Sequence, residues 1–317
     1  MTQAMTLGNT RRYPDTSDVS VQSIKSTFQA EGALCGATLH LPADATPDAP
    51  RPAILMVGGW GSVQMALTSS FVNRFVEAGY AVMEFDHPGW GDSGGFPRQG
   101  IDPWRRRRVS DTALVHLKAQ PWVCADRIVL WGTSFGGGHV VDLAGQHPEL
   151  QGAIVQVPML DGLAATLSMS PLRQLQFATL GLIDLLKPGQ PLCVPTLAPP
   201  GGFGTMDRDG AWDALQRALA AWPIRHYDNR VAARSTLTMP FYRPWKRLKD
   251  VQVPMLILGA THDTVAPFVA DKVARVGNPK LEVVEIDADH FDPYFEPLFP
   301  RVLQHQLAFL ARVLPLD

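Results

Sequence analysis

Short apolar runs alternate with longer stretches of helical periodicity along most of the chain, a pattern typical of a mainly parallel sheet flanked by helices. The runs are STFQA (26–30), ALCGATLHL (33–41), AILMV (53–57), YAVMEF (80–85), RIVLW (127–131), GAIVQV (152–157), MLILG (255–259) and LEVVEI (281–286). Only Glu31-Gly32 joins the first two runs, which predicts an antiparallel hairpin. Helix-length segments separate most of the others, as parallel crossovers require.

The residues between Val157 and Met255 break this rhythm. A structureless loop of that length is implausible in a compact domain. Helical patterns occur in LDGLAATL, LRQLQFATLGLIDLLK and DGAWDALQRALAAW, whereas the Pro/Gly-rich stretch 188–204 indicates irregular structure. Because the strand–helix pattern resumes at Met255, we interpret residues 160–250 as a helical lid inserted into a core domain of residues 1–159 and 251–317, rather than as a second independent domain.

Asp102 and Pro103 predict the start of a helix, with an apolar stripe following from Val109 onward. Four consecutive arginines occupy 105–108 in its first turns. Consecutive residues point in almost all directions around a helix, so the arginines cannot form one binding face. We expect a solvated helix start rather than a phosphate site.

Composition excludes some function classes. The 317 residues are 46% hydrophobic and 18% charged, with a net charge of −2 and a pI near 6.5, so nothing indicates binding to nucleic acid or to an anionic membrane. Three widely spaced cysteines predict reduced thiols. The first residues lack an apolar signal segment, and the longest apolar stretch, 177–187, is too short to span a bilayer. We expect a cytoplasmic protein with a small-molecule substrate; the oligomeric state stays open.

Two stretches fit Gly-x-Ser-x-Gly: GDSGG (91–95) and GTSFG (132–136). The first looks like the serine motif of trypsin-like proteases, which place a histidine and an aspartate upstream on a β-barrel pair. Only His40 and His87 precede Ser93, neither in an Ala-His-Cys context, and the expected architecture differs. We therefore expect Ser93 to belong to a turn-rich loop that shapes one wall of a pocket.

GTSFG has the context that a nucleophile needs. The apolar run RIVLW precedes Ser134 and a glycine-rich helix follows it, which is the strand–turn–helix arrangement of a nucleophile elbow. Gly132 and Gly136 keep side chains away from the sharp turn, which should hold Ser134 in a strained conformation above the sheet edge. The N-terminus of the following helix favours negative charge on a bound oxyanion.

A serine nucleophile needs an adjacent base, and nine histidines compete for that role. We select His290, which follows the strand LEVVEI by four residues, at the sheet edge where Ser134 emerges. His262 is interpreted as a neighbour of the acid. His139 and His147, on the helix after Ser134, are interpreted as packing or surface residues.

The acid must orient the imidazole and stabilise its protonated form. Asp263 lies four residues beyond MLILG, at the same sheet edge, and is the preferred candidate. Asp161, just after GAIVQVPML, is the rival. Asp289 adjoins His290, and adjacent side chains in an extended loop tend to diverge.

These motifs together resemble the α/β-hydrolase superfamily, over nearly the whole chain. They are AILMVGGWGS (53–62), FDHPGWGDSGG (85–95), GTSFG, PMLILGATHDTVAP (254–267) and VVEIDADHFDPY (283–294), in the family's order Ser, Asp, His. VAARSTLTMPFYRPW (231–245) is similar to a bacterial branch related to dienelactone hydrolases and the catalytic domain of X-prolyl peptidases. The resemblance implies an eight-stranded, mostly parallel sheet with helices on both faces.

The resemblance also implies an oxyanion hole made by the backbone N–H groups of Phe135 and Trp60. Many relatives carry His-Gly where this chain has Gly58-Gly59, so the chain departs from the pattern at Gly58. We expect a serine hydrolase that cleaves a carboxylic ester or a thioester through an acyl-enzyme. The alternatives are cleavage of an amide or a carbon–carbon bond by the same triad, or a ligand-binding protein on a hydrolase scaffold. No motif indicates a metal or nucleotide cofactor.

Overall fold

The computed structural model describes residues 21–64, 67–221 and 227–316. The N-terminal residues that bear on a signal segment lie outside these ranges. No helix in the described part is long and apolar enough to cross a membrane.

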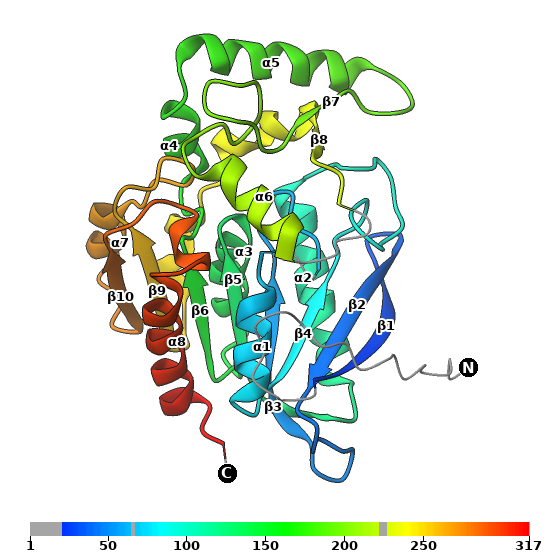
Figure 1. Ribbon diagram of the computed structural model, residues 1–317, viewed down its shortest axis with the longest axis vertical. Helices are drawn as coiled ribbons and strands as arrows, with labels where there is room; N and C mark the ends of the chain where they lie inside the picture. Colours follow the sequence, from blue (N-terminus) through cyan, green and yellow to red (C-terminus); the bar gives the residue numbers. More distant parts are fainter. Residues whose placement is uncertain (1–20, 65–66, 222–226, 317) are drawn as a thin grey trace.

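All eight apolar runs form strands, and these strands make one sheet in the order β1-β2-β4-β3-β5-β6-β9-β10 (Figure 1). β2 pairs antiparallel with β1 and β4, and the remaining pairs are parallel, so the expected hairpin and the mostly parallel sheet are confirmed. The strands are β1 (Gln22–Ala30), β2 (Ala33–Leu41), β3 (Arg51–Val57), β4 (Ala81–Phe85), β5 (Val123–Thr133), β6 (Gly152–Gln156), β9 (Met255–Ala260) and β10 (Leu281–Ile286).

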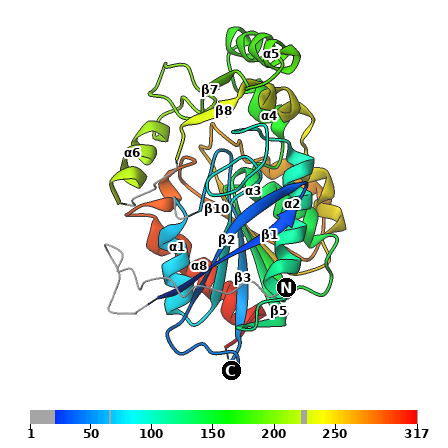
Figure 2. The same cartoon turned by 90° about the vertical axis from the view of Figure 1, so that its right-hand side faces the viewer.

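Helices cover both faces of the sheet, which is why its central strands are continuously apolar. In β5, Ile128 and Leu130 join the core under α2 (Pro103–Lys118), α3 (Phe135–Ala144) and α7 (Ala270–Val276). The alternating residues Val129 and Trp131 join the opposite core, under α1 (Ser69–Glu77) and α8 (Phe299–Val313). Figure 2 shows α1 and α8 on one side of the sheet and α2 on the other.

The segment between β6 and β9 leaves the sheet and returns to an adjacent position, since β6 and β9 pair with each other. It contains the three helices that periodicity predicted, near the expected bounds, and lies above one end of the sheet with α5 outermost (Figure 1). Its elements are α4 (Gly162–Leu167), α5 (Pro171–Leu186), β7 (Cys193–Pro195), α6 (Ala211–Ala221), β8 (Arg230–Ala232), and the 3-10 helices η1 (Ala233–Phe241) and η2 (Pro244–Asp250).

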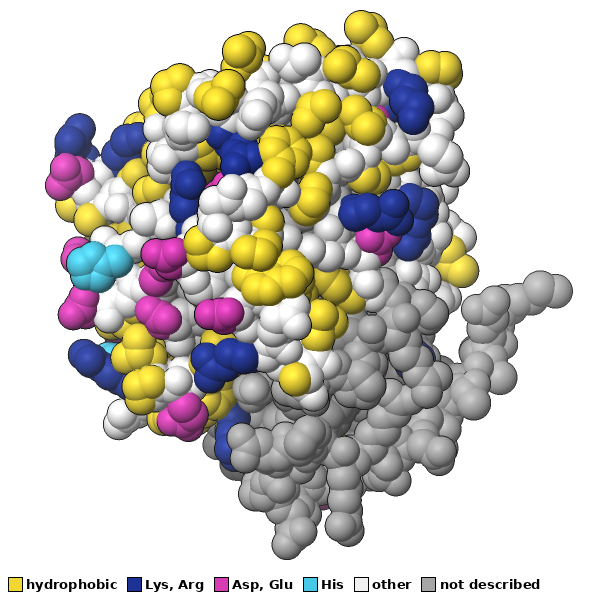
Figure 3. Space-filling model, turned by 45° about the horizontal axis from the view of Figure 1, so that its top comes forward, with side chains coloured by type: hydrophobic (Ala, Val, Ile, Leu, Met, Phe, Trp, Pro, Cys, Tyr) yellow, Lys and Arg dark blue, Asp and Glu magenta, His cyan; other side chains and the backbone are white. Residues whose placement is uncertain are grey.

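One feature of this segment differs from expectation. The Pro/Gly-rich stretch 188–204 is not wholly irregular, because β7 pairs with β8 in a small antiparallel sheet. α5 carries an exposed apolar face, so that hydrophobic side chains are spread over the upper surface (Figure 3). Its large exposed residues are Leu172, Leu175, Leu182, Ile183, Leu185 and Leu186.

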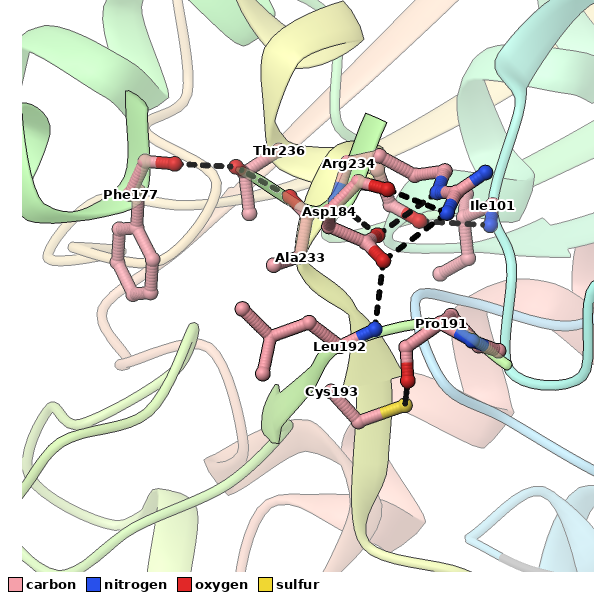
Figure 4. A network of polar contacts seen from close by, with 10 residues as sticks. Ile101, Phe177, Asp184, Pro191, Leu192, Cys193, Ala233, Arg234 and Thr236 are labelled. Carbon is pink, nitrogen blue, oxygen red and sulfur yellow. Dashed lines mark hydrogen bonds and ion pairs between the residues drawn. The ribbon is translucent and has the colours of Figure 1, made fainter. Parts of the chain in front are cut away.

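A buried ion pair fixes α5 to η1. The Asp184 carboxylate accepts hydrogen bonds from the Arg234 side chain and from the backbone N–H groups of Arg234 and Leu192 (Figure 4). Asp184 is fully buried, so these donors are what makes burial of its charge tolerable. Burial alone would raise the pKa of Asp184, but the hydrogen bonds and the charge of Arg234 lower it below its usual value.

Candidate active site

Ser134 lies in the sharp turn between β5 and α3, with φ 51° and ψ −123°. A positive φ in a residue other than glycine is strained, so the expected strain is present. The two flanking glycines are needed for space. A Cβ on Gly136 would lie 2.1 Å from the Val57 carbonyl oxygen, and a Cβ on Gly132 would lie 2.7 Å from the Gly136 carbonyl oxygen.

The structure brings Ser134, His290 and Asp263 together. His290 Nε2 lies 3.1 Å from Ser134 Oγ, and His290 Nδ1 lies 2.6 Å from Asp263 Oδ2. His290 follows β10, and Asp263 follows β9, as the spacing predicted. All three residues are less than one-tenth exposed, which strengthens the electrostatic interactions among them.

Backbone groups hold the Asp263 carboxylate in place. Its Oδ1 accepts hydrogen bonds from the N–H of Val265 at 2.9 Å and of Ala266 at 2.6 Å. With Oδ1 held this way, Oδ2 faces the imidazole. A proton on Nδ1 therefore has an acceptor, and Nε2 is left free to accept the serine proton.

The rival residues lie elsewhere. Asp161 caps α4 through the N–H groups of Leu163 and Ala164, and pairs with Lys272 and Arg243 rather than with His290. Asp289 accepts a hydrogen bond from the backbone N–H of His290 rather than from its ring.

The other candidate histidines also have separate partners. His262 is exposed and contacts Asp287. His147 contacts Asp111 and Glu149. His139 is completely buried, where its Nδ1 lies 2.7 Å from the Tyr242 hydroxyl.

The structure gives Ser93 a structural role. Its hydroxyl donates to the Asp86 carbonyl at 2.6 Å and accepts from the Gly36 N–H at 2.9 Å, so it joins the loop to β2. We expected this loop to shape a pocket wall. However, Ser93 lines neither of the two cavities beside Ser134.

The two residues expected to supply the oxyanion hole, Phe135 and Trp60, belong to segments that lie next to Ser134. The Phe135 N–H is in the first turn of α3, where backbone donors have no partner within the helix. The loop carrying Trp60 touches the serine, since a Cβ on Gly59 would lie 3.1 Å from Ser134 Cβ. The rings of Trp60 and Phe135 pack edge to face, 5.2 Å apart.

Two apolar cavities share Ser134, Trp60 and Met206 in their walls. The larger, about 280 Å³, lies under α4, α5 and η1 and is lined mainly by apolar residues such as Met159, Phe177 and Met239. The smaller, about 90 Å³, is bounded by α6 and includes His290.

The expectation of a solvated helix start is wrong for Arg106. Arg106 is only 3% exposed, and its Nη1 donates to the Gly59 carbonyl at 3.1 Å, next to Trp60. The sequence holds a signal for this burial. Position 106 is three residues before Val109 and seven before Ala113, so it lies on the apolar stripe of the helix. The signal belongs to this one position and is hidden when the four arginines are treated as a single charged run.

Within the described ranges, no cluster of three or more His, Cys, Asp or Glu side chains could hold a metal ion. No disulfide joins Cys35, Cys124 or Cys193 in the part of the chain that the structure describes.

This sheet, with a serine at a strand–turn–helix junction, defines an α/β hydrolase. Residues 48–278 match the family model described as "Serine aminopeptidase, S33", and the chain belongs to that family. The narrower resemblance to dienelactone hydrolases and X-prolyl peptidases is not confirmed, since the matching family model is described by neither.

Relatives of known sequence and structure agree with this family. The chain is 32% identical to the quorum-quenching protein AidA of Acinetobacter baumannii, over 91% of this chain and 94% of AidA. It is 24% identical to the thiohydrolase aneE of Aspergillus aculeatus, over 84% and 87% of the two chains. The crystal structure of the α/β hydrolase GrgF from Penicillium has a TM-score of 0.75 at 22% identity, covering 93% of this chain and 99% of that one. At this identity the structural likeness concerns the fold.

Proposed function

We propose that the protein is a serine hydrolase that cleaves a carboxylic ester or a thioester through an acyl-enzyme. The observation that carries this proposal is the continuous hydrogen-bonded chain from Ser134 through His290 to Asp263, at the junction of two apolar cavities. A binding protein has no need of a base and an acid aligned on a strained serine, which argues against a ligand-binding scaffold.

The proposed reaction begins when Ser134 Oγ attacks the substrate carbonyl and its proton moves to His290 Nε2. Asp263 stabilises the imidazolium through Nδ1–H. The N–H groups of Phe135 and Trp60 stabilise the oxyanion of the tetrahedral intermediate. His290 then protonates the departing oxygen or sulfur, and a water that it deprotonates releases the acid from Ser134.

The two cavities suggest how the substrate lies. The leaving group must be close to His290, which protonates it, and His290 lines the smaller cavity. The acyl chain is then placed in the larger cavity, under the segment 160–250, which we propose acts as a lid that limits acyl size. The names of two relatives, a thiohydrolase and the esterase FrsA of Klebsiella pneumoniae, support the ester and thioester classes.

Amide cleavage is the second candidate, because the description of the matching family model names a serine aminopeptidase. Such an enzyme needs a group that binds the substrate's terminal ammonium. The carboxylate in the wall of the larger cavity, Asp207, is already engaged by Arg173 at 3.0 Å and Arg208 at 3.3 Å. The apolar cavity with a neutralised carboxylate favours an uncharged acyl chain, and therefore the ester or thioester.

A fluorophosphonate probe and a panel of acyl esters, thioesters and amides of graded length test this function. Ser134→Ala should abolish both labelling and turnover, because no other nucleophile among the described residues is aligned with His290. Ser93→Ala is the matched control from the second Gly-x-Ser-x-Gly stretch and should keep the label. Labelling that persists in Ser134→Ala, or moves to Ser93, would refute the proposed nucleophile.

A further inference from the structure

Arg106 is a buried cation that forms no ion pair among the described residues. Among the described residues no carboxylate pairs with its guanidinium, and its Nε and Nη2 have no protein acceptor. The face of Trp90 lies 5.1 Å from its central carbon. Burial lowers the pKa of Arg106 to about 9, so the group is still protonated at neutral pH.

The surroundings of Arg106 compensate its charge only in part. The nearby rings of His87 and His139 are buried, and burial holds the pKa of each imidazole well below its usual value, so both are neutral. The charge of Asp86 favours the protonated form of Arg106, but the Asp86 oxygens accept hydrogen bonds from Gln64 and from the Asp92 N–H rather than from Arg106. Burying a charge in this way costs stability. The one hydrogen bond that its guanidinium donates among the described residues is therefore informative.

That contact is with one specific peptide group. The Gly59 carbonyl that accepts from Arg106 belongs to the same peptide unit as the Trp60 N–H. This unit is planar and trans, so its C=O and N–H point in opposite directions. With the carbonyl held toward Arg106, the N–H points away from α2.

We propose that Arg106 is a positioning residue for the oxyanion hole, holding the Gly59–Trp60 peptide so that the Trp60 N–H faces the oxyanion on the Ser134 adduct. This inference rests on the proposed function. A charged donor on the carbonyl also polarises the peptide and makes its N–H a stronger donor. The second donor to the same carbonyl, the Ser62 N–H at 3.3 Å, is neutral and longer.

The test uses Arg106→Met, which removes the charge and keeps an apolar side chain of similar length, and Arg106→Lys, which keeps the charge. Arg108→Met is the matched control, because Arg108 lies half a turn away on the same helix and pairs with Glu31 at the surface. For each variant we would measure kcat and KM on one ester, the inhibition constant of an alkyl trifluoromethyl ketone, and the melting temperature. The ketone forms a tetrahedral adduct whose oxyanion occupies the hole.

We expect Arg106→Met to weaken binding of the transition state and to leave binding of the substrate nearly unchanged. In Arg106→Met, kcat should fall about 10- to 100-fold, somewhat less than the loss typical of deleting a donor. KM should change less than about twofold, and ketone affinity should fall by the same factor as kcat/KM. The melting temperature should not fall, since an unpaired buried charge is removed. Arg106→Lys should recover part of kcat, and Arg108→Met should match the wild type.

Three results would overturn this role for Arg106. One is a wild-type kcat and ketone affinity in Arg106→Met. Another is a loss of kcat that accompanies a loss of melting temperature and is not recovered by Arg106→Lys. The third is an equal loss in Arg108→Met. If Arg106→Met does not fold, Arg106→Gln carries the same comparison. Turnover that survives Ser134→Ala would instead overturn the proposed function, so the two failures are distinguishable.

Discussion

At the scale of single residues, two buried aspartates show how partners decide a role. Asp263 has one oxygen held by backbone N–H groups and the other facing His290. Asp161 has both oxygens occupied by the start of α4 and by two cations. Burial alone would raise the pKa of Asp161, but Lys272 and Arg243 bring it below its ordinary value.

These contacts predict opposite effects of the same substitution. Asp263→Asn should lower kcat by about 10⁴-fold, because a neutral amide favours the wrong imidazole tautomer. Asp161→Asn should lower the melting temperature, since two cations lose their partner, while changing kcat little. Both are checked by kinetics on one ester and by thermal unfolding. Loss of activity in a stable Asp161→Asn, with Asp263→Asn nearly normal, would move the acid to the loop after β6.

The candidate site residues Ser134, His290 and Asp263 could be predicted from the sequence, because each follows a recognisable strand at one sheet edge. Parallel strands place their carboxyl ends at the same sheet edge, so these three positions are predictable from the sequence. Arg106 was not found, because its role depends on what lies across from α2. The Gly59 carbonyl comes from a loop distant in sequence, and no local pattern reports that contact.

At the scale of elements, the helices and strands that the sequence predicts are those with a clear apolar periodicity. The strands of the sheet and helices α4, α5 and α6 have clear apolar patterns, and all were expected near their observed bounds. The strands β7 and β8 are three residues each and pair over a long separation, so neither has a period to detect. The 3-10 helix η1 contains Pro240, which masks helical character in sequence.

Helix α5 offers a direct test of the proposed lid. Ala178 lines the larger cavity, whereas Leu182 is exposed one turn further along and lines neither cavity. Ala178→Trp should lower kcat/KM for a long-chain acyl ester by at least about tenfold, since the added ring takes volume from the acyl site. An acetyl ester should be affected less than about twofold. Leu182→Trp is the control and should leave both values unchanged.

The chain-length profile measured on Ala178→Trp also tests the assignment of the cavities. If long and short esters are affected equally, the acyl chain does not enter the cavity under α5. The lid would then have no part in selecting acyl size.

At the scale of the whole molecule, the sheet's two apolar faces account for most of the core, while a few polar groups are buried without full hydrogen bonding. His87 is the clearest of these. It is 3% exposed, and neither ring nitrogen has a partner among the described residues. Burial lowers the pKa of His87 well below its usual value, and the charge of Arg106 lowers it further. His139 behaves similarly, with Arg106 and Arg107 adding to the effect of burial.

Because buried His87 and His139 have lowered pKa values, the free energy of unfolding should decrease as the pH falls below 6.5. An unfolded histidine takes up a proton near pH 6.5, whereas the folded pKa of His87 is lower, so below pH 6.5 the unfolded state binds more protons. The contribution of His87 to the free energy of unfolding is therefore fully present above pH 6.5 and is lost as the pH falls toward the folded pKa of His87. Each such histidine contributes a slope of about 1.4 kcal/mol per pH unit in that window.

Replacing His87 with phenylalanine, which suits a site beside Phe85, should remove one such contribution. Urea unfolding of the wild type and His87→Phe between pH 8 and pH 5 measures it. The free energy of unfolding of the variant should fall less steeply below pH 6.5, and the two curves should run parallel above it, because the variant has one fewer group that takes up a proton only on unfolding. Parallel curves over the whole range would mean that His87 takes up its proton equally well when folded, and that its site is open to solvent.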